Sequence, residues 1–303
     1  MTIRIWLEAF RLRTLPLAFS SIVLGGALAA AEGAFRGDVT ALALLTTLFL
    51  QILSNLANDY GDHVHGLDSE GRTGPQRTLQ AGKLTPAAMK KAILLFAFLS
   101  LGTGSVLILT ALGKEMTPEL LLFFVLGLAA IAAAVKYTVG KKPYGYRALG
   151  DLFVLLFFGL AGVAGTYYLN TRTLPGRLFL PAAALGLLAT GVLNLNNMRD
   201  REHDRAMGKM TLAVLLGPRG SRWYHLFLLI TPLVLGILYV LPCGTSPWRF
   251  LFLVVSPLLF LNMKAVVKTS SPEDLDPLLR QLAFTTLLFA LTFGAGVILS
   301  QSL

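Results

Sequence analysis

Long apolar stretches recur along the chain and alternate with short polar segments. They occupy residues 14–31, 40–57, 88–113, 118–137, 149–169, 177–197, 224–242, 249–268 and 281–302. Each is close to the roughly 20 residues that an α-helix needs to cross the hydrocarbon core of a bilayer. Gly and Pro within them are compatible with membrane helices, because neighbouring spans satisfy the freed backbone groups. The pattern predicts an all-α integral membrane protein of about nine transmembrane helices, forming a single domain over residues 1–303.

Composition and charge support a membrane protein and indicate its orientation. Of the 303 residues, 55% are hydrophobic and 14% are charged, which leaves too few polar groups to cover a soluble surface. The net charge of +10 would suggest nucleic acid for a soluble protein, but 21 of the 26 Lys and Arg residues lie in the N-terminus and the even-numbered loops. The positive-inside rule therefore predicts a cytoplasmic N-terminus, and we expect no nucleic-acid partner.

Acidic and amide side chains concentrate where the second and sixth apolar stretches end. The first motif consists of Asn55, Asn58, Asp59 and Asp62, and the second motif of Asn194, Asn197, Asp200 and Asp204. Their spacings of three and four place each set on one helix face, provided that each helix continues past its apolar stretch. A carboxylate at a membrane edge is unfavourable unless something binds it, so both motifs are candidate sites.

The two motifs belong to segments that resemble each other. Asn55-Leu-Ala-Asn58 matches Asn194-Leu-Asn-Asn197, and Ala81-Gly-Lys-Leu-Thr85 downstream matches Met207-Gly-Lys-Met-Thr211. Two matching elements in the same order indicate a diverged internal repeat. We place its halves at approximately residues 14–137 and 149–268.

Oxygen ligands at two helix ends suit Mg²⁺, which prefers oxygen and is commonly shared with substrate phosphates. A basic loop, residues 136–147, lies between the two motifs in the sequence and contains Lys141, Lys142, Tyr144 and Tyr146. Lysines supply charge to phosphate oxygens, and the arginines Arg72, Arg77 and Arg199 add bidentate donors. The alternative is that these residues only obey positive-inside topology and anchor the protein at the membrane interface.

Four stretches taken together resemble a known family. They are NDYGDHVHGLD at 58–68, GPQRTLQAGKLTP at 74–86, YTVGKKPYGYRALGD at 137–151 and NNMRDREHDRAMGKMTLAVLLG at 196–217. This set resembles the UbiA superfamily of intramembrane aromatic prenyltransferases, and within it the 1,4-dihydroxy-2-naphthoate polyprenyltransferase branch of menaquinone synthesis. The resemblance covers nearly the whole chain. It implies a UbiA-like helical bundle in the inner membrane of a bacterium, with the active site facing the cytoplasm.

The resemblance also implies roles for particular residues. Mg²⁺ would be held against the diphosphate by Asp59, Asp62, Asp200 and Asp204, with support from Asn58 and Asn197. Lys141, Lys142, Arg199 and Lys209 would neutralise the leaving diphosphate. Independently of the resemblance, Arg72 and Arg77 are candidate donors to the phosphate, and Tyr144 and Tyr146, which interleave with the charged residues, are candidates to stabilise a carbocation by their ring faces. The expected substrates are a polyprenyl diphosphate and an aromatic acceptor, in contact with membrane lipid. The acceptor base stays open among Asp68, Glu70 and Asp151.

Three other interpretations are open at this point. A prenyltransferase of the same superfamily with another aromatic acceptor would carry the same motifs. A secondary transporter would place charges at the middle of the membrane, whereas these acids lie at predicted helix ends. A noncatalytic quinone-binding subunit would have no need of so many acids at one membrane face.

Overall fold

The computed structural model describes residues 3–67, 74, 76–242 and 244–302, and the regular elements within these ranges are helical. The longer helices are α2 (Leu15–Ala31), α3 (Gly37–Val64), α4 (Pro86–Leu112), α5 (Pro118–Lys136), α8 (Phe179–Arg199), α10 (Leu212–Val240), α11 (Ser256–Lys268) and α12 (Leu275–Ser302). The shorter ones are α1 (Ile3–Phe10), α6 (Gly150–Val154), η3 (Leu155–Ala164), α7 (Gly165–Thr171), α9 (Arg201–Ala206) and η5 (Pro247–Val255). Single turns lie at Leu12–Thr14, Tyr144–Tyr146, Gly176–Leu178 and Pro272–Asp274.

The predicted number of spans is confirmed for the described part of the chain. Nine helical segments there are long and apolar enough to cross a membrane. Several are longer than the apolar stretches that predicted them, because polar residues extend the helices beyond the hydrocarbon. The second span continues to Val64, and the seventh begins at Leu212.

Threonine side chains determine where three of the long helices begin. Thr85, Thr117 and Thr211 each accept a hydrogen bond from the backbone N–H three residues ahead. A side-chain oxygen at this position satisfies one of the free N–H groups of the first turn, and Pro86 and Pro118 have the φ angle that the first helical position requires.

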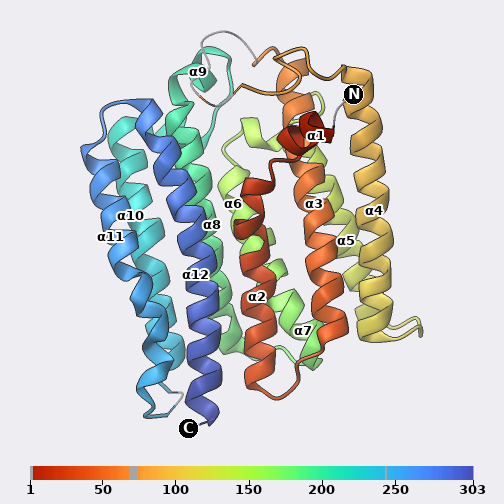
Figure 1. The fold of residues 1–303 in the computed structure, drawn as a ribbon, viewed down its shortest axis with the longest axis vertical. Helices are drawn as coiled ribbons and strands as arrows, with labels where there is room; N and C mark the ends of the chain where they lie inside the picture. Colours follow the sequence, from red (N-terminus) through yellow and green to blue (C-terminus); the bar gives the residue numbers. More distant parts are fainter. Residues whose placement is uncertain (1–2, 68–73, 75, 243, 303) are drawn as a thin grey trace.

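The helices run side by side along the long axis of the molecule, and the two termini lie at opposite ends (Figure 1). Helix α9 and the N-terminus lie at the same end, drawn at the top (Figure 1). Helix α8 is the central helix, packed against α10, η3 and α12. The end of α8 that leads into α9 therefore lies close to several other helices.

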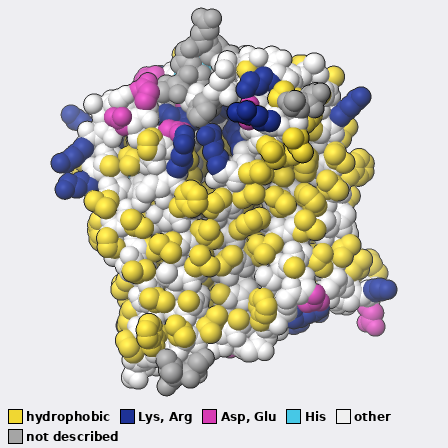
Figure 2. All heavy atoms as spheres, in the orientation of Figure 1, with side chains coloured by type: hydrophobic (Ala, Val, Ile, Leu, Met, Phe, Trp, Pro, Cys, Tyr) yellow, Lys and Arg dark blue, Asp and Glu magenta, His cyan; other side chains and the backbone are white. Residues whose placement is uncertain are grey.

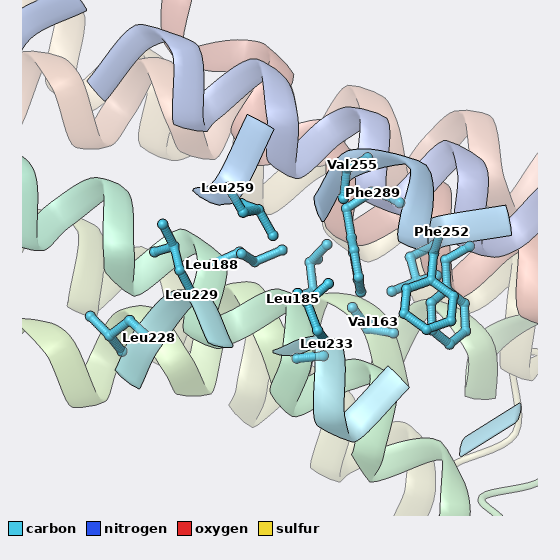
Figure 3. Close-up of a cluster of buried hydrophobic side chains, with 14 of the residues drawn as sticks. Val163, Leu185, Leu188, Leu228, Leu229, Leu233, Phe252, Val255, Leu259 and Phe289 are labelled. Atoms are coloured by element: carbon cyan, nitrogen blue, oxygen red, sulfur yellow. The ribbon is translucent and has the colours of Figure 1, made fainter. Parts of the chain in front are cut away.

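The core combines small and large apolar residues. Leu185 and Leu188 of α8 pack with Leu229 of α10, Phe252 of η5 and Phe289 of α12 (Figure 3). On the face drawn in Figure 2, apolar side chains form a broad band across the middle of the molecule, and charged side chains gather towards its two ends. This distribution matches the polarity of a bilayer.

Two glycines allow the fifth span to approach α8 closely. A Cβ on Gly159 would lie 2.6 Å from the carbonyl oxygen of Ala182, and a Cβ on Gly186 would lie 3.0 Å from Cα of Gly159. Small residues at such crossings let membrane helices pack backbone to backbone. Gly159 lies in the π-helical stretch Leu155–Ala164.

The two segments of the proposed repeat have local counterparts in the structure. Gly82 and Gly208 both adopt positive φ angles, of 65° and 73°. Thr85 and Thr211, each three residues later, are both helix N-caps. We retain the internal repeat as a proposal that these matching turns support.

Candidate active site

The first motif lies on the last turns of α3. The helix continues past its apolar part to Val64, so Asp59 and Asp62 share one face as predicted. Both are buried, with 1% and 3% of their surface exposed. Arg77, from the loop after α3, lies 2.5 Å from Oδ2 of Asp62 and 3.4 Å from Oδ1 of Asp59. Arg11, which precedes α2, also pairs with Asp59.

The second motif spans a break between two helices. Helix α8 ends at Arg199, Asp200 caps it, and α9 begins at Arg201, so Asp200 stands at the junction of two helices. Backbone hydrogen bonds from Asp200 to Asn196 and from Asp204 to Asp200 keep the spacing of four residues across this junction. Asp200 and Asp204 are buried, with 5% and 2% exposed. Arg199 donates to both oxygens of Asp200 at 2.9 Å. Nζ of Lys209 lies 3.5 Å from Oδ1 of Asp204.

The basic loop connects the two motifs in space. Thr138 donates a hydrogen bond to the carbonyl of Ala57 on α3 at 3.0 Å. Tyr146 donates to Oδ1 of Asp62 at 2.6 Å, and its own carbonyl accepts from the N–H of Met210 at 3.2 Å. Nζ of Lys209 lies 5.4 Å above the Tyr146 ring. Tyr146 therefore contacts both halves of the site.

Gly61 is required for this contact. A Cβ at Gly61 would lie 2.6 Å from the backbone carbonyl carbon of Thr138. No side chain fits there without moving the loop away from α3. The glycine inside the first motif thus positions the basic loop against the acidic residues.

Burial changes the proton affinity of the site. The pKa of Asp204 is raised to about 6, first by burial and then by the nearby carboxylates of Asp200 and Asp62, while Lys209 opposes the shift. The pKa of Tyr146 is raised far above its ordinary value by burial and by Asp62, so its hydroxyl stays protonated and donates. The effect of Asp62 on the pKa of Asp204 places the two motifs within electrostatic reach of each other.

The donor chemistry fits a divalent cation shared with phosphate. Oδ2 of Asp204 is buried and has no hydrogen-bond partner among the described residues. No group of three or more His, Cys, Asp or Glu in the described ranges could by itself enclose a metal. Mg²⁺ commonly takes one or two carboxylates and completes its shell with water and phosphate oxygens. The aspartates fit that manner of binding and would not form a closed protein cage.

The other predicted site residues divide into several groups. Asn58 of the first motif accepts from Thr138 at 3.3 Å, and Asn197 of the second motif is buried. Lys141 and Lys142 are exposed on the basic loop. Arg72 lies outside the described residues, as do Asp68 and Glu70.

Tyr144 makes different contacts from Tyr146. Its hydroxyl donates to the carbonyl of Ala133 at 2.9 Å, and its ring stacks on Phe153 with centroids 4.0 Å apart. These contacts hold the ring against α5 and α6 and engage its hydroxyl with a backbone carbonyl. Of the two loop tyrosines, the structure brings Tyr146 to the acidic residues.

Two residues of the site were not predicted from the sequence. Arg11 was interpreted only as part of the positive N-terminus, and nothing in its local sequence indicates a contact with Asp59. Asp276, at the start of α12, accepts from Arg199 at 2.8 Å. Each lies far along the chain from its partner, and the spacing of residues on one helix predicts contacts only between residues a few positions apart.

Comparison with known proteins identifies the family. The UbiA prenyltransferase family matches residues 18–289. The chain belongs to this family. The protein named 1,4-dihydroxy-2-naphthoate octaprenyltransferase in Escherichia coli is 46% identical over 296 residues, covering 98% of this chain and 96% of that protein. Its namesake in Haemophilus influenzae is 44% identical over 299 residues, with the same coverage of each chain.

Solved structures agree with the fold. A UbiA homolog from Aeropyrum pernix K1 superposes with a TM-score of 0.67 at 17% identity, covering 95% of this chain and 97% of that one. A UbiA homolog from Archaeoglobus fulgidus, bound to DMAPP and Mg²⁺, has a TM-score of 0.62 at 20% identity and covers 97% and 98% of the two chains. The predicted UbiA-like bundle is therefore confirmed.

Proposed function

We propose that this chain transfers a polyprenyl group from an allylic diphosphate to 1,4-dihydroxy-2-naphthoate, with loss of carbon dioxide, to give demethylmenaquinone. The observation that carries the reaction class is the meeting of two buried aspartate motifs and their basic partners at one end of a UbiA bundle. The acceptor rests on the relatives that bear this activity in their names at 44% and 46% identity.

In this proposal the four aspartates bind Mg²⁺, with Asn58 and Asn197 supporting them. Bound Mg²⁺ would neutralise the diphosphate and so favour ionisation of the allylic C–O bond. Asp204 is the aspartate best prepared for a metal, because one of its buried oxygens has no hydrogen-bond partner among the described residues.

The basic residues complete the charge around the diphosphate. Arg77 and Lys209 lie at the carboxylates, within the same cluster that would receive the phosphate oxygens. Lys141 and Lys142 extend from the exposed part of the basic loop, where they can approach a phosphate as point charges. Arg72 would add a bidentate donor to the phosphate oxygens, as proposed from the sequence. Tyr146 positions Asp62 by its hydrogen bond.

The protein is an integral membrane protein, and we place it in the inner membrane of a bacterium. The end of the bundle that holds both motifs would face the cytoplasm, because 21 of the 26 Lys and Arg residues lie in the N-terminus and the even-numbered loops. Basic side chains also gather at this end in the space-filling view (Figure 2).

The test is transfer of radiolabel from a long-chain polyprenyl diphosphate to 1,4-dihydroxy-2-naphthoate, with and without Mg²⁺, while carbon dioxide release is measured. Metal-dependent product together with carbon dioxide supports the reaction, the acceptor and the cofactor. Transfer to 4-hydroxybenzoate or homogentisate in place of the naphthoate would reject the acceptor and retain the chemistry. Absence of transfer to every acceptor would reject the proposed function.

A further inference from the structure

Arg199 joins two carboxylates that are far apart in the sequence. Its Nε and Nη2 donate to the two oxygens of Asp200, and its Nη1 donates to Oδ1 of Asp276 at 2.8 Å. The Arg199 side chain is only 4% exposed, so solvent does little to screen these pairs. Nη2 also donates to Asn196 on the preceding turn of α8.

Asp276 is held in place by its own surroundings. It lies in the first turn of α12, and that end of the molecule packs against α8. Its second oxygen accepts from Arg280, one turn later, at 2.5 Å. The result is an ordered series of alternating charges, Arg280, Asp276, Arg199 and Asp200, that leads from the exposed start of α12 to the second motif.

Because Arg199 pairs with both Asp200 and Asp276, its interaction with Asp200 is weaker than that of an arginine paired with Asp200 alone. A guanidinium that is bidentate to one carboxylate occupies both of its oxygens, and those oxygens are the ones a metal would use. A second carboxylate that accepts from the same guanidinium weakens its interaction with the first carboxylate and fixes the plane of the guanidinium. Groups that orient a metal ligand in this way strongly affect the affinity for the metal.

We infer that Asp276 is a positioning residue of the second motif, which divides the Arg199 guanidinium between two carboxylates and leaves Asp200 able to bind Mg²⁺. This inference rests on the proposed function, through the role of Asp200 as a metal ligand. It also changes the role of Arg199, which acts on Asp200 and no longer counts as a free donor to the diphosphate.

The experiment measures Mn²⁺ binding by electron paramagnetic resonance in purified protein, with a non-reactive thio-diphosphate analogue of the prenyl substrate present. Asp276→Asn should weaken Mn²⁺ binding about tenfold or more, the range found when groups behind metal ligands are lost. Asp274→Asn is the matched control, because this exposed acid lies two residues away and loses the same charge. It should change binding less than about twofold.

A double-variant cycle tests the mechanism. In an Arg199→Gln background Asp276 has no guanidinium to divide, so adding Asp276→Asn should change Mn²⁺ binding less than about twofold. An equal tenfold loss in both backgrounds, equal losses for Asp274→Asn and Asp276→Asn, or no loss at all would overturn the inference. If Asp276→Asn alone does not fold, the Arg199→Gln pair still decides the question.

The same readout separates the inference from the proposed function. Mn²⁺ binding is measured without the aromatic acceptor and without turnover. A wild-type protein that binds Mn²⁺ with the analogue but transfers no prenyl group would reject the proposed reaction while the cycle still tests Asp276. Wild-type protein that binds no Mn²⁺ at all would overturn the inference directly.

Discussion

Removal of the Arg77 charge gives the sharpest test of the first motif. Arg77 is 8% exposed and pairs with Asp62 and Asp59, which are both more deeply buried. Arg77→Met keeps most of the side-chain volume and removes the positive charge. Arg11 still pairs with Asp59, but the Asp62 carboxylate keeps no ion pair among the described residues; it retains the hydrogen bond from Tyr146 and the more distant charge of Lys209.

The expected loss follows from the cost of an unpaired buried charge. Removing one partner of a buried ion pair typically destabilises a protein by about 3–5 kcal/mol. Since about 1.4 kcal/mol corresponds to tenfold, the ratio of folded to unfolded protein should fall by about two to four orders of magnitude. Mg²⁺ should restore part of the loss, because a cation at the aspartates replaces the missing charge.

The assay is reversible unfolding in mixed detergent micelles, followed by circular dichroism with and without Mg²⁺. Lys83→Met is the matched control, because Lys83 forms a 2.7 Å pair with Glu8 in which both side chains are more than 40% exposed. A pair of that kind contributes about 0–1 kcal/mol. Equal destabilisation by the two variants, or no response of Arg77→Met to Mg²⁺, would refute the reasoning.

Three further predictions concern turnover and pH. Asp62→Asn and Asp200→Asn should each abolish prenyl transfer while the protein still accumulates in the membrane; near-normal activity in either variant would reject the metal assignment. Lys142→Ala should raise the KM for the prenyl diphosphate far more than the KM for the aromatic acceptor, and equal increases would indicate a disturbed fold. Asp204 has a folded pKa of about 6 against an ordinary 3.8, so metal-free folded protein binds an extra proton between these values. Its free energy of unfolding should therefore fall by about 2 kcal/mol as pH rises from 4 to 7, and Asp204→Asn should remove that dependence in metal-free unfolding measurements.

The sequence predicted the features that depend on local spacing. The apolar stretches gave the number of spans, because a bilayer requires helices of a definite length. The spacing of Asp59 and Asp62 gave their shared face, since α3 continues to Val64. The spacing did not show that α8 ends and α9 begins at Asp200, because residue spacing alone carries no information about the backbone angles of a single residue.

Contacts between residues of distant segments could not be predicted from the sequence. Tyr144 and Tyr146 are two positions apart and look equivalent in the basic loop. A single turn at Tyr144–Tyr146 directs Tyr144 to Ala133 and Tyr146 to Asp62. Which tyrosine reaches the aspartates depends on how α5, α6 and α3 pack, and one chain without its tertiary contacts carries no signal for it.

The pattern of ion pairs explains how so many buried acids coexist at one end of the bundle. In the first motif, Asp59 and Asp62 are matched by Arg11 and Arg77. Around the second motif, the carboxylates of Asp200, Asp204 and Asp276 are matched by Arg199, Lys209 and Arg280.

Each group is thus close to neutral before any ligand binds, which keeps the desolvation penalty of the separate charges low. A divalent cation entering alone would leave either group with excess positive charge. A cation that enters with a diphosphate brings compensating negative charge, so this arrangement favours joint binding of metal and substrate over metal alone. Arg77 and Lys209, which balance Asp62 and Asp204 in the free protein, are also the groups best placed to receive the phosphate oxygens when Mg²⁺ takes over the carboxylates.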